Sequence, residues 1–296
     1  MTSCVLVRSF AKINLALAVL GPREDGYHEI RTVLQTIDLH DILEIRPSSA
    51  LELECEGLED VPLAENLVWR AATRLRREYP GAGARITLRK KIPRGSGLGG
   101  GSSNAAAALL GLIRLWGVDV PPARLRALAA GLGADVPFFL SGGTALGIGR
   151  GDEVYPLPDL PTCNVVVIYP GMSIPTAEAY AMLDRRLTPE ASRDKIWTFC
   201  SLLEAGSVFL DGVFNDFERV VPAAHGAVRE ARDFLTEHGA TAALLSGSGS
   251  SVFGFFRTEE SALAASSAIE REAWRVFPAK TLCRSGYFQR LFGPSE

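Results

Sequence analysis

The sequence predicts an α+β protein with two domains, residues 1–156 and 157–296. Strand-like segments with a two-residue alternation are mixed with segments of helical periodicity, without the regular strand–helix–strand order of a doubly wound sheet. The proline-rich segment Pro156 to Pro161 interrupts this pattern near the middle of the chain. The 296 residues, 47% of them hydrophobic, suffice for two packed cores.

The first domain is expected to begin with a meander of mostly antiparallel strands. Its strands are predicted at Cys4 to Val7, Ile13 to Val19, Glu29 to Asp38, Asp41 to Pro47 and Leu51 to Glu56. Helical periodicity follows, interrupted by strand-like runs. Here the helices are predicted at Asn66 to Glu78, Ser103 to Trp116 and Pro122 to Ala130, and the strands at Arg85 to Leu88, Phe138 to Ile148 and Asp152 to Pro156.

The second domain combines buried-type strands with helices. The strands are predicted at Asn164 to Tyr169, Ala242 to Leu245, Ser251 to Phe256 and Ala279 to Arg284. The helices are predicted at Thr176 to Leu183, Lys195 to Glu204, Ala224 to His238 and Glu259 to Glu272. A glycine turn, Gly247 to Gly249, joins two of the strands, and a hairpin turn is its simplest interpretation.

Composition excludes several classes of function. A formal net charge of -3 without a long basic run argues against nucleic acid or an anionic membrane as the main partner. No apolar run approaches the roughly 18 residues that span a bilayer. Five scattered cysteines without a C-x-x-C pair, and four histidines without ligand spacing, predict neither disulfides nor a protein-bound transition metal. We expect a cytoplasmic protein.

A glycine-rich loop is the strongest chemical signal. Five of the seven residues from Gly95 to Gly101 are glycine, and a helix follows. Glycines let successive backbone N–H groups turn toward one point, and the helix N-terminus adds attraction for an anion, so we expect a phosphate cradle. No lysine follows the last glycines, which disfavours a Walker loop, and the strand and acid of a dinucleotide site are not evident. A flexible glycine linker is the remaining alternative.

Three polar residues, Lys12, Asn14 and Asp135, occupy positions where a charged or hydrogen-bonding partner is expected. Lys12 lies in an apolar strand, where burying a lysine is costly unless it is paired. Asn14 follows two residues later and therefore projects from the same face. Asp135 precedes Val136-Pro137, where a carboxylate can cap a turn or serve as a base, and the residues alone leave both open.

Together these motifs resemble a known enzyme superfamily. Phe10 to Leu15, the glycine loop and Leu245 to Val252 follow one another as in GHMP-type small-molecule kinases. Within that superfamily, Asp25 to Glu29, Gly133 to Pro137 and Pro170 to Thr176 resemble the family of 4-diphosphocytidyl-2-C-methyl-D-erythritol kinases. The resemblance implies an N-terminal ATP-binding domain, a C-terminal ferredoxin-like domain and an active site between them. It also implies a small cytidine diphosphate substrate, phosphorylated with ATP and Mg²⁺ on its 2-hydroxyl, in a monomer or homodimer.

The resemblance assigns roles residue by residue. Asp135 matches the catalytic base, and Lys12 matches the lysine that stabilises charge beside it. Tyr27 matches the residue that stacks on cytosine, and His28 the one that binds its edge. The matched substrate residues are Asn14, Tyr27, His28, Ser173, Thr176 and Tyr180. The matched ATP residues are Asn66, Lys90, Pro93, Arg94, Gly95, Ser96, Gly97, Leu98, Gly99, Gly100, Gly101, Ser102, Ser103, Gly247 and Gly249. No carboxylate is assigned to Mg²⁺, which ATP oxygens and water are expected to hold.

Simpler interpretations stay open beside these roles. Ser102 and Ser103 are also expected as caps of the following helix, and Lys90, Lys91 and Arg94 could form a solvated basic strip. Another GHMP-type kinase, acting on homoserine, mevalonate or a sugar, is the nearest alternative in function. A catalytically silent nucleotide sensor on the same fold is the alternative from another class.

Overall fold

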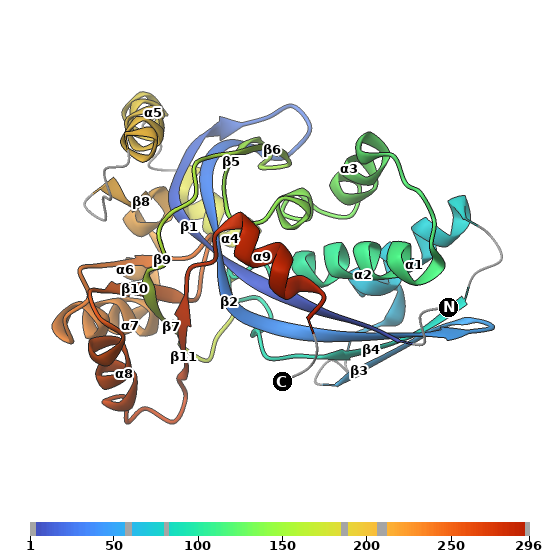
Figure 1. Cartoon of the computed structure of the whole chain (residues 1–296). Coiled ribbons are helices and arrows are strands. Elements are labelled where there is room, and N and C mark those ends of the chain that lie inside the picture. Colours follow the sequence, from blue (N-terminus) through green and yellow to red (C-terminus); the bar gives the residue numbers. More distant parts are fainter. Residues whose placement is uncertain (1–3, 57–60, 80–82, 185–188, 206–211, 294–296) are drawn as a thin grey trace.

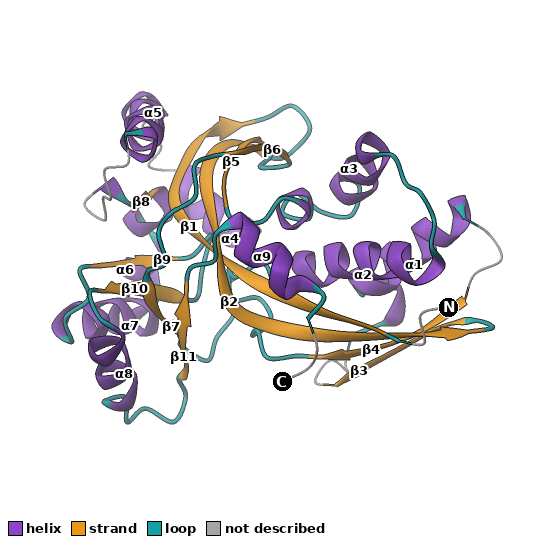
Figure 2. Ribbon diagram, viewed as in Figure 1, coloured by secondary structure: helices purple, strands orange, loops and turns teal. Residues whose placement is uncertain are grey.

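The computed structural model describes residues 4–56, 61–79, 83–184, 189–205 and 212–293. These residues form two β-sheets with helices packed against them, which confirms the α+β class (Figure 1, Figure 2). In the larger sheet the strands are β1 (Val5–Pro22), β2 (His28–Ser48), β3 (Leu51–Glu56), β4 (Gly83–Arg89), β5 (Thr144–Gly149), β6 (Glu153–Pro156) and β8 (Phe214–Asn215). Their order is β3-β4-β2-β1-β8, with β5 pairing β2 and β6 pairing β5.

Four helices share one hydrophobic core with this sheet: α1 (Leu67–Glu78), α2 (Gly100–Trp116), α3 (Pro122–Ala130) and α9 (Arg284–Leu291). Figure 1 shows all four on the same side of the long strands β1 and β2. The alanine-rich first half of α2 lets the helix lie close to β1 and β2, and α2 starts where the glycine loop ends. The position of that loop is therefore fixed by the packing of α2.

The smaller sheet contains β7 (Asn164–Tyr169), β9 (Ala242–Leu245), β10 (Val252–Phe256) and β11 (Arg275–Lys280), in the antiparallel order β11-β7-β10-β9. Two helices, α7 (Gly226–Glu237) and α8 (Glu259–Ser267), pack against it. This strand–helix–strand–strand–helix–strand order is that of a ferredoxin-like domain, as expected. The remaining helices are α4 (Thr176–Asp184), α5 (Pro189–Glu204) and α6 (Val221–Ala224).

Strand β1 joins the two sheets through three hydrophobic cores. Val7 packs with α1 and α2, Ile13 packs between the sheets, and Leu17 packs with α4 and α7. The pairing of β1 with β2 shifts register between Phe10 and Ala11, a β-bulge directly before Lys12. Bulges re-aim the side chains that follow them. The segment that carries Lys12 is therefore held rigidly between both halves of the molecule.

Several expected element boundaries are wrong. The structure has one continuous strand, β1, where two were expected, and likewise one continuous β2. The polar residues inside β1 and β2 do not end the strands, because their side chains form hydrogen bonds in the interior. Ser9, for example, donates a hydrogen bond to Ser103. The expected meander is also wrong, because β3 pairs in parallel with β4 instead of returning to β2. The connection between β3 and β4 runs through α1, as a parallel pair requires.

Other corrections concern turns and the C-terminal part. The first half of the expected strand Phe138 to Ile148 is a 3₁₀ turn, and the strand begins only after Gly142 and Gly143, which have positive φ. Helix α8 ends at Ser267, five residues before its expected end, and the last strand, β11, begins and ends four residues earlier than expected. Helix α9 was missed entirely. Its N-cap is Cys283, whose sulfur accepts the Gly286 N–H and gave no recognisable capping signal.

The docking of α9 can be tested with two glycines of similar conformation. Gly142 has φ +59, and a Cβ there would lie 2.4 Å from Cδ1 of the buried Tyr287 on α9. Gly117 has φ +63 and no atom within 4 Å of such a Cβ. Overpacking costs about 1–3 kcal/mol, so we expect Gly142→Ala to lower the free energy of unfolding by that much more than Gly117→Ala. Equal losses in denaturant unfolding would contradict this packing.

Candidate active site

The glycine loop owes its shape to backbone conformations that favour glycine. Gly95, Gly97 and Gly99 have φ values of 61°, 79° and 70°, and Gly99 is the N-cap of α2. A Cβ on Gly97 would lie 2.0 Å from the carbonyl oxygen of Ser246. The loop thus presents backbone N–H groups and the first turn of α2 to one concave surface, which is a favourable place for an anion.

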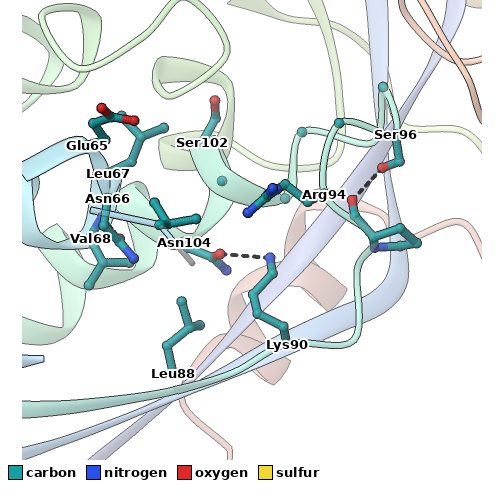
Figure 3. Close-up of a pocket in the computed structure, with 17 residues that line it drawn as sticks. Glu65, Asn66, Leu67, Val68, Leu88, Lys90, Arg94, Ser96, Ser102 and Asn104 are labelled. Carbon is teal, nitrogen blue, oxygen red and sulfur yellow. Dashed lines mark hydrogen bonds between the residues drawn. The ribbon is translucent and has the colours of Figure 1, made fainter. Parts of the chain in front are cut away.

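A hollow of about 370 Å³ lies over this loop. Figure 3 shows Lys90 and Arg94 directing nitrogen atoms toward it, with Asn66 and Val68 of the α1 N-terminus opposite. Asn66 also caps α1, since its Oδ1 accepts the Val68 N–H at 2.9 Å. The expected ATP residues that line this hollow are Asn66, Lys90, Pro93, Arg94, Gly95, Ser96, Gly97, Gly99, Gly100, Gly101 and Ser102.

A buried carboxylate that the sequence analysis missed holds Lys90 in place. Asp41 is fully buried and pairs with the Lys90 ammonium, while its oxygens also accept bonds from the backbone of Lys91 and Ile92 at 2.6 and 2.8 Å. Asn104 donates to Asp41 at 2.9 Å and accepts from Lys90 Nζ at 2.9 Å. A buried charge needs this degree of pairing. The available signal was an aspartate inside an apolar strand.

A second hollow, of about 310 Å³, adjoins the first. It is lined by Lys12, Asn14, Asp135, Tyr27, Tyr180 and Thr176 among the expected residues. Both hollows share Gly97, Gly99 and Ser102. A ligand in one hollow therefore meets a ligand in the other at the glycine loop, beside Lys12 and Asp135.

Lys12 is buried, with only 4% of its surface exposed. Its ammonium donates to Asn14 Oδ1 at 2.7 Å, and Asn14 in turn donates to Thr32 Oγ1 at 2.8 Å. Burial lowers the pKa of Lys12, and the negative charge of Asp135 acts in the opposite direction. The shared face of Lys12 and Asn14 is found, whereas the hydrogen bond of the Lys12 ammonium goes to Asn14, and Asp135 acts on Lys12 through its charge.

The second glycine turn lies directly against the glycine loop. Ser246 Oγ donates to the Gly97 carbonyl at 3.0 Å, and the Ser251 N–H donates to the Ser96 carbonyl at 3.0 Å. Gly247 lines the second hollow, where a Cβ would lie 3.3 Å from Lys12 Nζ. Buried Asn215, which the sequence did not reveal, fixes this turn by donating to the Leu245 and Gly247 carbonyls at 2.9 and 2.8 Å.

Two tyrosines, Tyr27 and Tyr180, form an aromatic wall of the second hollow. The ring of His28 stacks on Tyr180 with centroids 4.1 Å apart, and His28 Nε2 lies 2.8 Å from Asp184 Oδ1. Tyr27 is 53% exposed, and the guanidinium of Arg150 lies 4.8 Å from the centroid of its ring. Burial raises the pKa of Tyr180, so its hydroxyl stays protonated and can donate.

Several expected residues do not line either hollow. The side chain of Leu98 is buried in the core between the sheets, and only its backbone serves the site, by accepting the Lys12 N–H at 3.0 Å. Ser103 is turned inward to Ser9. His28, Ser173 and Gly249 lie beside the lining residues and not among them.

The expected capping role of Ser102 and Ser103 is wrong. The helix begins at Gly100, so both serines lie in its first turn and Gly99 is the N-cap. Gly100 and Gly101 form the first residues of the helix and do not precede it. The close packing of α2 on the sheet overrides the low helix propensity of glycine. Ser102 instead lines both hollows.

Neither a metal-binding cluster nor a membrane-spanning helix occurs among the described residues. Among the described residues, no group of three or more histidine, cysteine, aspartate or glutamate side chains is placed to hold a metal ion. In the same part of the chain, no helix has the length and apolar character that crossing a membrane would require.

Comparisons with known proteins identify relatives of both halves. The GHMP kinases N terminal domain profile matches residues 66–143, and the GHMP kinases C terminal profile matches residues 201–276. The chain is 48% identical to the 4-diphosphocytidyl-2-C-methyl-D-erythritol kinase of Solibacter usitatus, over 85% of this chain and 81% of that protein. It is 40% identical to the protein of the same name from Syntrophus aciditrophicus, over 93% and 99%.

Solved structures show the same similarity to kinases of this kind. A crystal structure of 4-(cytidine 5'-diphospho)-2C-methyl-D-erythritol kinase superposes with a TM-score of 0.78 at 35% identity, covering 93% of this chain and 98% of that one. Homoserine kinase from Cytophaga hutchinsonii superposes with a TM-score of 0.73, covering 97% of each chain. At 20% identity, that second similarity shows a shared fold alone.

The burial of Lys12 predicts a pH-dependent stability. Because its pKa is lowered in the folded protein, the unfolded chain binds more protons between that lowered pKa and the ordinary value of 10.5, and stability rises with pH across that window. We expect Lys12→Met to be more stable than the unmodified protein near pH 7, with a difference that shrinks as the pH approaches 10.5. Denaturant unfolding at several pH values measures this, and a pH-independent difference would contradict it.

Proposed function

The chain belongs to the 4-diphosphocytidyl-2-C-methyl-D-erythritol kinase family of GHMP kinases, and we infer that it phosphorylates this cytidine diphosphate ester with ATP in the non-mevalonate route to isoprenoids. One observation in the structure supports this function above the others. Two hollows of small-molecule size meet at a glycine loop, and Lys12 and Asp135 stand on the side away from the nucleotide. A kinase needs this arrangement, because its two substrates must meet in line.

ATP is assigned to the first hollow. Its adenosine would lie toward Asn66 and Val68, and its triphosphate would follow the glycine loop to the shared residues Gly97, Gly99 and Ser102. Backbone N–H groups and the N-terminus of α2 then stabilise phosphate oxygens. Lys90, which is paired with Asp41, and Arg94 are the two cations among the described residues that line this hollow.

The acceptor substrate is assigned to the second hollow, with its 2-hydroxyl near Asp135. As the oxygen–phosphorus bond forms, Asp135 accepts the hydroxyl proton, and the bond between the γ-phosphorus and the ADP oxygen breaks. Lys12 stabilises the negative charge that develops on the transferring oxygens. Asn14 holds the Lys12 ammonium at 2.7 Å and orients it toward the reaction. A loose transition state needs little proton removal, so Asp135 also serves by orienting the hydroxyl.

The cytosine is assigned to the aromatic wall. Tyr27 offers an exposed ring for stacking, and Tyr180 lies deeper in the same hollow. Since His28 already covers one face of Tyr180, that face is not open to the base. Asp184 occupies Nε2 of His28, so Nδ1 is the atom available to the edge of the base. Thr176 lines the hollow at the start of α4, where its Oγ1 lies 3.3 Å from Ser248 Oγ, and Ser173 lies outside the lining.

Mg²⁺ is expected to enter with ATP. The described residues lack a carboxylate cluster of the kind that would hold a resident ion. Phosphate oxygens and water would therefore supply most of the Mg²⁺ ligands. The hydroxyl of Ser102, which lines both hollows, is the protein group available to the ion. The ion would neutralise phosphate charge.

Substrate choice tests the function itself. We expect ADP release with ATP, Mg²⁺ and 4-diphosphocytidyl-2-C-methyl-D-erythritol, and release at least a hundredfold slower at the same concentration, on the order of 3 kcal/mol, with homoserine or mevalonate. A coupled ADP assay measures both. Faster turnover of homoserine or mevalonate would move the protein to another GHMP activity, and ATP binding without turnover of any of them would favour a sensor.

The role of Asp135 is tested by a nearly isosteric change. Asp135→Asn is expected to lower kcat by about 10²–10⁴ while the KM for each substrate changes little, because general bases contribute about that much. Asp119→Asn provides a control, since Asp119 is exposed between α2 and α3 and lines neither hollow. An Asp135→Asn enzyme with more than a tenth of the normal kcat would exclude Asp135 as the base.

A further inference from the structure

Phe139 is a buried residue beside the reaction centre that lines neither hollow. It lies on the 3₁₀ turn Pro137–Leu140, directly after the segment of Asp135, with 0% of its surface exposed. Building on the proposed function, we propose that Phe139 is a positioning residue for phosphoryl transfer. Its ring and its backbone together hold Lys12, Asp135 and the N-terminus of α2 in one fixed arrangement.

The ring of Phe139 and the stem of Lys12 lie against the same point of the glycine loop. A Cβ on Gly99 would lie 2.9 Å from Phe139 Cζ, 3.2 Å from Phe139 Cε2 and 3.0 Å from Lys12 Cγ. Gly99 is the N-cap of α2, where the phosphates of ATP are assigned. A lysine has a flexible four-carbon stem, so packing along the stem restricts where its ammonium can lie. The rigid Phe139 ring supplies such packing beside Gly99.

The backbone of Phe139 is connected to Asp135 through two consecutive turns. The Phe139 N–H donates to the Val136 carbonyl at 3.2 Å, and the Val136 N–H donates to the Gly133 carbonyl at 3.1 Å. Asp135 lies in the turn from Gly133 to Val136, and Phe139 ends the turn that follows. A displacement of Phe139 is therefore transmitted to Asp135 as well as to Lys12.

Helix α9 anchors Phe139 through its backbone. The Tyr287 hydroxyl donates to the Phe139 carbonyl at 2.5 Å, and the Tyr287 ring packs on Phe10 with centroids 5.5 Å apart. Burial raises the pKa of Tyr287, so its hydroxyl stays protonated and can donate. Phe10 directly precedes the β-bulge before Lys12. Tyr287 thus connects the strand that carries Lys12 to the turn that follows Asp135.

The main test is Phe139→Leu, which keeps an apolar side chain and removes part of the ring that lies against Gly99 and Lys12. Because a displacement of about 1 Å can cost about a hundredfold in rate, we expect kcat to fall about tenfold to a hundredfold. The KM for the cytidine substrate should stay within about twofold, since Phe139 lines neither hollow and acts on the reacting groups. Steady-state kinetics at saturating ATP measure both constants.

Phe255→Leu is the matched control. Phe255 is equally buried and lines neither hollow. It packs edge-to-face on a neighbouring phenylalanine, as Phe139 does. Both variants should lower the midpoint of denaturant unfolding by similar amounts, while Phe255→Leu keeps kcat within about twofold of normal. A second variant, Tyr287→Phe, retains the ring and removes the hydroxyl. It should lower kcat about twofold to tenfold, as loss of one hydrogen bond predicts.

The proposal is overturned if Phe139→Leu keeps a normal kcat, or if Phe255→Leu lowers kcat as much as Phe139→Leu does. Should Phe139→Leu not fold, Tyr287→Phe decides in its place, and a normal kcat there would overturn the proposal. Failure of the proposed function gives a different result, because the unmodified enzyme would then turn over another acceptor, with which the same kcat ratios are measured. If it turns over none, crystal structures of the two variants decide, since Lys12 and Gly99 should move in Phe139→Leu and not in Phe255→Leu.

Discussion

The contact between the two glycine turns is the constraint on which the rest of the site depends. Ser246 and Ser251 bond to the carbonyls of Gly97 and Ser96, and no side chain larger than hydrogen fits at Gly97. This contact joins the smaller sheet to the N-terminus of α2. It also forms the wall common to both hollows, so the nucleotide and the acceptor substrate cannot be positioned independently of it. Asn215 and Leu98 support the two turns from behind, through backbone carbonyls and N–H groups.

Lys12 is held under this contact at an electrostatic cost. Its ammonium is buried, its pKa is lowered, and its stem lies so close to Gly99 that a Cβ there would be 3.0 Å from Lys12 Cγ. A free lysine in such a place destabilises the folded protein. The strand that carries it, β1, offsets the cost by packing in three hydrophobic cores. Stability elsewhere in the fold thus maintains a charged group where phosphoryl transfer needs it.

Sequence patterns predicted what depends on local chain chemistry. The glycine loop, the buried strand β7 and the shared face of Lys12 and Asn14 all follow from residue type and spacing. What they could not predict depends on partners distant in the chain. Asp41 bonds to a residue 49 positions further along the chain, and Asn215 to one 30 positions further. In the sequence alone, a polar residue whose buried partner is distant resembles the end of a strand. Helix α9 was missed because its cap is a cysteine.

One loop contact sets the geometry of both binding sites, and Gly97→Ala tests this dependence most directly. Gly239→Ala is the control, because Gly239 has a similar φ, +89 against +79, and no atom within 4 Å of a Cβ. Steady-state kinetics should show that Gly97→Ala raises the KM for ATP and for the cytidine substrate together and lowers kcat, while Gly239→Ala leaves all three near normal. A change confined to the KM for ATP, or no change, would contradict the account.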